Sequence, residues 1–206
     1  LSPEEKNSRI KNLELFYKTG FPNKKNEDWK FSDLNSILSN NFNYIVNNDF
    51  SPKEKNFKKI DKFEHNYISL LNGKLISKDF SYEEKNKILI KDFDQNEPVK
   101  LESDNSLTFL NNALSSEGFS LEISKDYKLK KPLVIYNHFS KNLKNKILNN
   151  KNSIKLNRGS EVTLIDYNNS QEQSNFIKNT IDIVSLEEDA FLKNIIIQEG
   201  KSNGHF

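Results

Sequence analysis

The three histidines are the first side chains in this sequence to consider for catalysis or metal binding. His65, His138 and His205 are too far apart to form a local metal-binding pattern such as H-x-x-x-H. Each is therefore predicted to be an ordinary surface or packed histidine. The sequence contains no cysteine, so these residues offer no disulfide, no thiolate nucleophile and no thiolate ligand for a metal.

Two short acidic runs are the other candidates for binding a cation. Asp92, Asp94 and Glu97 lie close together, but this run lacks the glycine and the closing glutamate of a calcium-binding loop. Residues 187–189 are all acidic and lie between two predicted strands. Both runs are predicted to be solvated turns. Phosphate-binding loops and nucleophile elbows are also absent from the sequence. We therefore assign no catalytic, cofactor-binding or metal-ligating residue, and we expect a protein that is not an enzyme and holds no cofactor.

Charge and hydropathy argue against several other classes of protein. The chain has 31 Lys and Arg residues against 29 Asp and Glu residues, a net charge of +2. Nucleic-acid-binding proteins concentrate positive charge on one face, whereas the two densest lysine groups here are predicted to be a solvated helix face and a solvated loop. These groups are Lys53, Lys55, Lys58, Lys59 and Lys62, and Lys141, Lys144, Lys146 and Lys151. No apolar run approaches the roughly 20 residues of a membrane span and the first residues are charged, so a cytoplasmic protein is expected.

The elements that position these side chains begin with a well-marked helix. Ser2 and Glu5 form a capping box, Pro3 occupies the first helical position and Gly20 marks the end. Its predicted apolar face consists of Ile10, Leu13, Phe16 and Tyr17. A second short helix is predicted to start at Ser32 and a third at Ser51. The single tryptophan, Trp29, lies between the first two helices and is predicted to pack as an anchor between them.

The hydrophobic period changes at about residue 66. Asn72-Gly73 predicts a hairpin between strands at 67–71 and 74–77, followed by a short strand at 88–90 and a helix over 106–114. After residue 118, apolar pairs recur at period two, which indicates a series of short strands. These pairs are Leu121 and Ile123, Leu133 and Ile135, Ile154 and Leu156, Val162 and Leu164, Ile181 and Ile183, and Ile195 and Ile197. Such a series fits a sandwich, a barrel or a stacked solenoid, and the pattern alone leaves all three open.

An ordered set of short motifs resembles the SufD branch of the SufB/SufD family, which belongs to the SUF machinery for iron–sulfur cluster assembly. The first motif comprises Gly20-Phe21-Pro22, Lys25, Glu27, Trp29-Lys30-Phe31-Ser32 and Leu34. The later matching segments are 70–75, 109–114 with Gly118, 131–135, 158–166 and 179–198. Together they span nearly the whole chain, and their order is more specific than any one of them.

This resemblance implies an α+β fold in which a helical domain precedes a right-handed parallel β-helix. We expect an N-terminal helical domain over 1–65, a hairpin and helix leading into the core over 66–118, and the first solenoid coils over 119–206. The resemblance also implies a non-catalytic scaffold that assembles with a SufB-like paralogue and a SufC-like ATPase, without nucleic acid or membrane. The chain contains no methionine and ends directly after a strand-like stretch, so we interpret both ends as cut. The family's functional side chains are then expected beyond Phe206, and none is carried onto this sequence.

Two alternative functions follow from other features of the sequence. A repeated β region is also typical of carbohydrate-active β-helix enzymes such as lyases and glycosidases, which need a carboxylate or basic cluster on one face. The sequence shows no obvious cluster of this kind. A nucleic-acid-binding module would rest on lysine content alone. The scaffold is therefore the preferred hypothesis.

Overall fold

The structure is a computed structural model, and its described residues form two β-sheets with two α-helices at one end. The described residues are 1–24, 26, 29–30, 34, 38, 44–45, 59–94, 105–140, 143, 145–170, 176–200 and 204–205. The helical elements are α1 (Pro3–Thr19), the short 3₁₀ turn η2 (Lys85–Lys87) and α3 (Ser106–Leu114). The strands are β1 (Tyr44–Ile45), β2 (Asn66–Leu71), β3 (Lys74–Asp79), β4 (Ile88–Asp92), β5 (Phe119–Ile123), β6 (Leu133–His138), β7 (Lys146–Leu156), β8 (Glu161–Ser170), β9 (Phe176–Leu186), β10 (Phe191–Gly200) and β11 (Gly204–His205).

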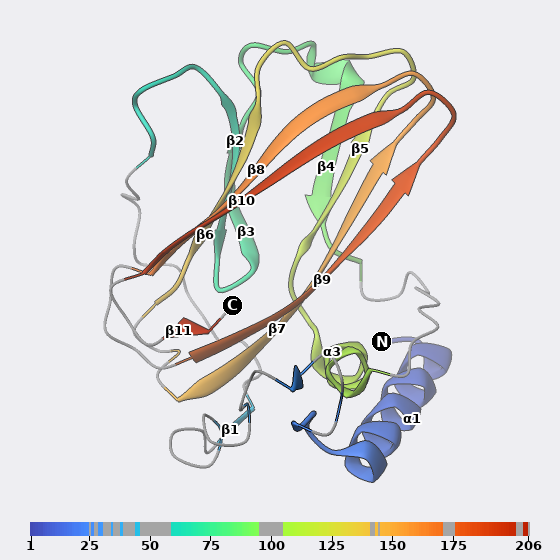
Figure 1. Ribbon diagram of the computed structural model, residues 1–206. Coiled ribbons are helices and arrows are strands. Elements are labelled where there is room, and N and C mark those ends of the chain that lie inside the picture. The colour runs from blue at the N-terminus through green and yellow to red at the C-terminus, as the bar shows by residue number, and fades with distance from the viewer. Residues whose placement is uncertain are drawn as a thin grey trace.

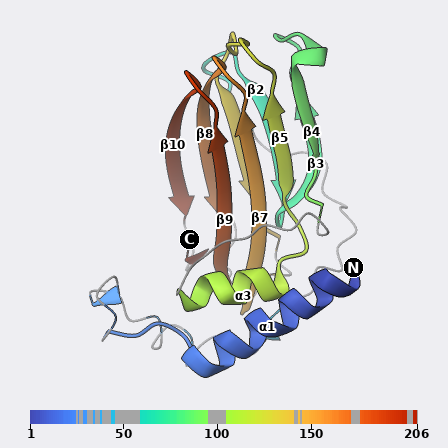
Figure 2. The same ribbon diagram turned by 90° about the vertical axis from the view of Figure 1, so that its right-hand side faces the viewer.

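Helix α1 begins and ends where its sequence predicts, but most of its apolar face is not buried. The Ser2 hydroxyl accepts a hydrogen bond from the Glu5 amide at 3.1 Å. Of the four residues of the predicted apolar face only Phe16 is buried, while Ile10 is 47% exposed and Tyr17 is 76% exposed. Apolar spacing along the helix therefore does not by itself mean burial at Ile10 and Tyr17. The reason is that α1 packs along one side of α3 and does not cross a sheet (Figure 2).

The second and third predicted helices fall largely outside the described residues. Leu34, which lies near the start of the second predicted helix, is described and buried. Trp29 is half-buried, and its amide donates a hydrogen bond to the Asn26 carbonyl at 2.9 Å. Its predicted role as an anchor between helices stays a prediction, because residues 31–33 and 35–37 lie outside the described part of the chain.

The β2–β3 hairpin confirms the turn predicted at Asn72-Gly73. The two strands pair in antiparallel fashion, and both turn residues have positive φ, 50° at Asn72 and 85° at Gly73. A type I′ turn requires this conformation at both central positions, and Asn-Gly adopts it most readily. A side chain at Gly73 is also excluded by packing, because a Cβ there would lie 1.3 Å from Asn150 Nδ2. The turn is therefore fixed both by its own sequence and by β7.

The strands from β5 onward alternate between the two sheets. The first sheet has the order β11-β9-β7-β5-β4, with β1 also paired to β7, and the second has the order β10-β8-β6-β2-β3 (Figures 1 and 2). Most neighbours are parallel, and the antiparallel pairs are β2–β3 and β4–β5. Phe176 lies beside Lys146 and Phe191 beside Glu161, so each pair is thirty positions apart in the sequence. The α+β class is thus confirmed, with two mixed sheets; we call them together the stack.

The main core lies between the two sheets and is built from the predicted period-two pairs. The four pairs from Leu121 to Leu164 all belong to it. The pairs in β9 and β10 lie in strands as predicted, but on the outer faces. The inward positions of β9 and β10 are those of Val184 and Asn194, because these residues are the register partners of the core residues Ile154 and Leu164. Ile181, Ile183, Ile195 and Ile197 occupy the alternate positions. Period two predicts a strand but does not say which of its faces is buried.

Candidate functional site

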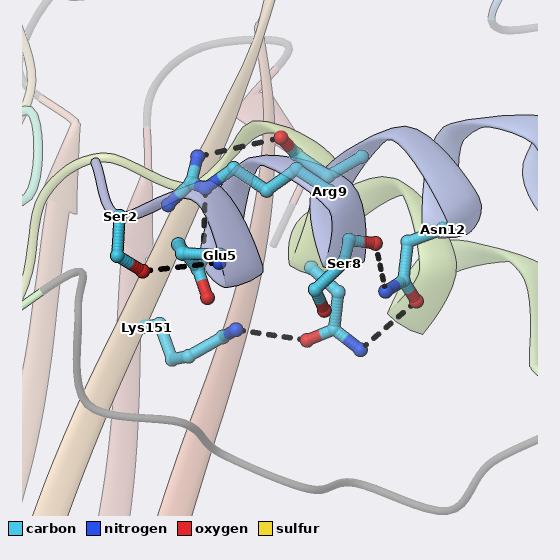
Figure 3. A network of polar contacts seen from close by, with 8 residues as sticks. Ser2, Glu5, Ser8, Arg9, Asn12 and Lys151 are labelled. Atoms are coloured by element: carbon cyan, nitrogen blue, oxygen red, sulfur yellow. Dashed lines mark hydrogen bonds and ion pairs between the residues drawn. The ribbon is translucent and has the colours of Figure 1, made fainter.

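A chain of polar contacts joins the helices to the stack and is the most developed polar cluster outside the core (Figure 3). Lys151 projects from the outer face of β7, is 7% exposed, and its Nζ donates to Asn112 Oδ1 at 2.8 Å. Asn112 Nδ2 donates in turn to Asn12 Oδ1 at 3.4 Å, and Asn12 Nδ2 donates to the Ser8 carbonyl at 2.9 Å. The contacts run from β7 through α3 to α1. We call these residues, with Glu5 and Arg9, the junction.

Arg9 supplies the second connection within the junction. Its Nε pairs with Glu5 Oε1 at 2.8 Å, one helical turn earlier, and a second guanidinium nitrogen donates to the Ala113 carbonyl at 3.3 Å. Ala113 lies in the last turn of α3, where carbonyl groups lack helical partners and the helix dipole favours a cation. Arg9 therefore holds the end of α3 against α1.

The prediction that Lys151 belongs to a solvated lysine group is wrong. Burial under α3 and, to a lesser extent, the nearby Arg9 guanidinium lower its pKa to about 8, while the Glu5 carboxylate opposes this change. A lysine with such a pKa is partly neutral near pH 8 and could in principle act as a base or nucleophile. Its hydrogen bond to Asn112 fixes the amine beneath the helix, so this geometry positions α3 and indicates no reaction.

Helix α3 is also fastened to two neighbouring strands by one amide. Asn111 is fully buried, and its Nδ2 donates to the carbonyls of Asn150 on β7 and Asn179 on β9, both at 2.7 Å. Asn179 Nδ2 returns a hydrogen bond to the Leu107 carbonyl of α3 at 2.9 Å. The Asn111 side chain thus hydrogen-bonds to β7 and β9 at once. The position of α3 therefore depends on the register between these two strands as well as on the surface that they form.

Charged side chains also occupy inward-facing positions of the stack, where Asp166 and Lys178 are half-buried and Asp182 is exposed. The polar belt, as we call it, consists of Asn137, Asn152, Asp166, Asn168, Lys178 and Asp182, on inward positions of β6 to β9. Asn152 Nδ2 donates to Asp182 Oδ1 at 2.7 Å, and Lys178 Nζ donates to Asn168 Oδ1 at 2.8 Å. Partial burial lowers the pKa of Lys178, and the nearby Asp166 and Asp182 carboxylates oppose this shift. A cavity of about 30 Å³ borders the belt, enough for one or two water molecules.

The inner face of the last strands is only partly covered. Val184 and Ile196 are 45% and 62% exposed, whereas Ile154, the register partner of Val184, is 4% exposed. No described strand pairs with β10 on the side away from β8. An apolar inner row that continues from a buried core to an exposed edge is suited to contact with further protein.

The fold brings two of the three histidines close together. His65 and His138 approach the same tyrosine: His65 Nε2 lies 2.7 Å from the Tyr136 hydroxyl, and the His138 ring stacks on the Tyr136 ring with centroids 6.0 Å apart. The side chain of His205 is not described. Within the described ranges no three potential His, Cys, Asp or Glu ligands gather around a point where a metal could sit.

The acidic run at 187–189 forms the predicted turn and contacts the turn at 157–160. Glu187 Oε2 accepts from the Arg158 amide at 3.0 Å, and the Glu188 carbonyl accepts from the Gly159 amide at 3.0 Å. The other run is described at Asp92 and Asp94, while Glu97 lies outside the described residues. Sequence reasoning missed the junction and the polar belt, because their key contacts join residues far apart in the chain and follow no local motif. Lys151 lies 39 positions from Asn112, and Asn152 lies 30 positions from Asp182.

The profile of the SufBD protein N-terminal region matches residues 2–135, well over half of the chain. The chain belongs to the SufBD family. This membership supports involvement in iron–sulfur cluster assembly by the SUF system. No curated protein sequence matches the chain.

The matched region of this SufBD chain covers α1, the hairpin, α3 and the first strands of both sheets. It includes the helical side of the junction but stops before Lys151. The junction therefore connects the matched N-terminal region with the strands that follow it. None of the helices in the described ranges has the length and apolar character needed to cross a membrane.

Proposed function

We propose that this chain is a non-catalytic scaffold subunit of the SUF iron–sulfur cluster assembly complex, of the SufD branch, acting in the cytoplasm. The observation that carries the proposal is the SufBD match over residues 2–135. The motif around Trp29 favours the SufD branch, because its residues resemble that branch in order and spacing. We further propose that the stack forms the first coils of a right-handed parallel β-helix. Strands that alternate between two sheets at thirty-residue intervals support that architecture.

A scaffold role implies that the chain binds specific partners and catalyses no reaction itself. The proposed partners are a SufB-like paralogue and a SufC-like ATPase, with no nucleic acid, membrane or resident cofactor. Two features support a structural role: the polar contacts of the junction position helices, and the partly exposed inner row on β9 and β10 offers apolar surface to further protein.

Co-purification tests this proposal. The full-length protein carrying an affinity tag is co-expressed with the SufB-like and SufC-like proteins of its own organism, and the eluted complex is sized by gel filtration. We expect all three chains in one peak, ATP hydrolysis only when the SufC-like subunit is present, and no hydrolysis by the tagged chain alone. The matched control omits one partner at a time. Failure to retain either partner, or hydrolysis by the chain alone, would contradict the scaffold assignment.

A further inference from the structure

Tyr136 lies on the outer face of the second sheet and is fully buried. Residues 59–65, which we call the crossing segment, pass over it before the chain enters β2. The Tyr136 ring contacts the rings of His65, Tyr67, His138 and Tyr167, with centroids 5.7 to 6.4 Å apart. The only polar group of this side chain is its hydroxyl, and that hydroxyl faces the crossing segment.

The hydrogen bonds at the hydroxyl define which atoms carry protons. The Ile60 amide donates to the Tyr136 hydroxyl oxygen at 2.9 Å. His65 Nδ1 lies 2.9 Å from the Phe63 carbonyl, which can only accept, so Nδ1 carries a proton. In a neutral imidazole Nε2 is then an acceptor, and the Tyr136 O–H donates to it at 2.7 Å. Burial raises the pKa of Tyr136, so its hydroxyl keeps its proton. Each of these three donors, the Ile60 amide, His65 Nδ1 and the Tyr136 hydroxyl, therefore has one acceptor.

Protonation of His65 breaks this match. The imidazolium carries a proton on Nε2 as well, and this proton points at the hydroxyl proton of Tyr136. The hydroxyl must then turn away, yet its ring is fully buried, and the described residues provide it with no second acceptor. A buried donor without an acceptor is costly, so the contact between the crossing segment and Tyr136 weakens.

The charges around His65 do not offset this effect. The charged and titratable groups of the crossing segment and of the surfaces that face it are Lys59, Asp61, Lys62, Glu64, Tyr67, Asp79, Tyr82, Lys131 and His138. Lys59 Nζ stands 3.4 Å above the Tyr67 ring, and Glu64 pairs with Lys131 at 2.6 Å. The Glu64 carboxylate, next to His65 in the chain, is thus paired with Lys131 and not with His65. Burial and, to a lesser extent, the Lys59 ammonium lower the pKa of His138 to about 4, so His138 stays neutral above pH 5.

We infer that His65 makes the crossing segment a pH-sensitive cover: neutral His65 fastens residues 59–65 over Tyr136, and protonated His65 releases them. Histidine is the side chain that ordinarily changes charge between pH 8 and pH 5. Release uncovers the aromatic outer face of β2 and β6, so acidification converts a covered face into an accessible one. This inference is independent of the proposed scaffold function.

Hydrogen–deuterium exchange of the full chain, read by mass spectrometry at pH 7.5 and 5.5, tests the inference. Rates in peptides covering residues 59–66 are divided by the rates of the unstructured peptides at the same pH, and peptides from β7 report on global folding. In the wild-type chain we expect protection of the crossing segment to fall about tenfold at pH 5.5 while β7 stays protected. In His65→Gln the side-chain oxygen can still accept from Tyr136 but does not titrate, so protection should be equal at both pH values.

His138→Gln is the matched control and should behave as the wild type. The inference is wrong if wild-type protection is independent of pH, if His65→Gln keeps the same loss, or if His138→Gln abolishes it. Should His65→Gln fail to fold, Tyr136→Phe decides the matter. Without the hydroxyl, protection should be low at both pH values, and a remaining pH-dependent loss would overturn the inference.

Discussion

Single side chains with many partners fix the loops of this molecule, and Glu83 is the clearest example. Its carboxylate is buried and accepts hydrogen bonds from Asn66 Nδ2 at 2.8 Å, the Tyr127 hydroxyl at 2.7 Å, and the amides of Lys130 and Lys131 at 3.0 and 3.1 Å. Burial alone would raise its pKa, but these four donors outweigh burial, and the pKa of Glu83 lies below its usual value of 4.5. The carboxylate therefore stabilises the fold in its charged form.

Replacing this carboxylate should cost stability in a pH-dependent way. Because the folded-state pKa is the lower one, the contribution of Glu83 is fully present above about pH 4.5 and is lost as the pH falls through the folded-state value. We expect Glu83→Gln to lower the free energy of unfolding by about 2 kcal/mol at pH 7, and by less at pH 3. Urea unfolding at the two pH values measures this. Glu84→Gln, on the exposed neighbour, is the control and should change little.

Lys151 should give the opposite dependence on pH. Its pKa is about 8 in the folded chain, against an ordinary value of 10.5, so between these values the unfolded chain binds a proton that the folded chain does not. The wild-type free energy of unfolding should therefore gain about 3 kcal/mol from this group as the pH rises from 8 to 10.5.

Comparison of two lysine variants isolates this contribution. Urea unfolding of Lys151→Met across the interval should lack the gain, whereas Lys155→Met, on the same face of β7 with a half-exposed side chain, should retain it. Equal slopes in the two variants would show that Lys151 is not the titrating group.

At the scale of elements, neighbouring asparagines of α3 have different tasks. Asn111 donates to two strand carbonyls, whereas Asn112 accepts from the Lys151 ammonium. Asn111→Asp would place a carboxylate against two carbonyl oxygens, and should lower the free energy of unfolding by about 3 kcal/mol or more. Asn112→Asp, beside a cation, should change it by less than about 1 kcal/mol. Urea unfolding of the two variants gives the comparison, and equal losses would refute this assignment of roles.

The hairpin offers a similar matched pair. Gly73→Ala combines a positive φ with a Cβ that would clash with Asn150, whereas Gly20→Ala has a φ of 71° and no atom within 4 Å of the added Cβ. Because Gly20 combines this φ with a ψ of −173°, a region essentially restricted to glycine, we expect a loss of about 2 kcal/mol for Gly20→Ala from backbone strain alone, and clearly more for Gly73→Ala. Thermal or urea unfolding distinguishes the two, and similar losses would mean that Asn150 moves aside at little cost.

An element could be predicted from the sequence where the residues that specify it lie close together in the chain. The hairpin, α3 and the start of α1 were found from sequence because Asn72-Gly73, the period of 106–114 and the Ser2 cap act over a few residues. The outward direction of Ile181 and Ile195 could not be found, since it is set by pairing with strands thirty positions earlier. The burial of Lys151 depends on Asn112 and on α1, and no residue near it in the chain indicates it.

At the scale of the whole molecule, burial decreases along the stack from β7 to β10. Ile154 and Val184 are register partners on the same inner row, but only Ile154 is enclosed. In the 206-residue chain Ile154→Ala should lower the free energy of unfolding by about 3 kcal/mol and Val184→Ala by less than about 1 kcal/mol. Urea unfolding measures both. If the two losses were equal, Val184 would have to be covered by another part of the protein.

The thirty-position register has a consequence for how the chain can change in length. An inserted residue within β8 or β9 would exchange the inner and outer faces from that point on, and would bring Ile165 or Ile183 inside in place of Asp166 or Asp182. An inserted residue in the turns at 157–160 or 187–190 leaves the strand faces intact. Natural length variation in this part of the molecule should therefore concentrate at these turns, or occur in whole thirty-residue units that add or remove one strand from each sheet.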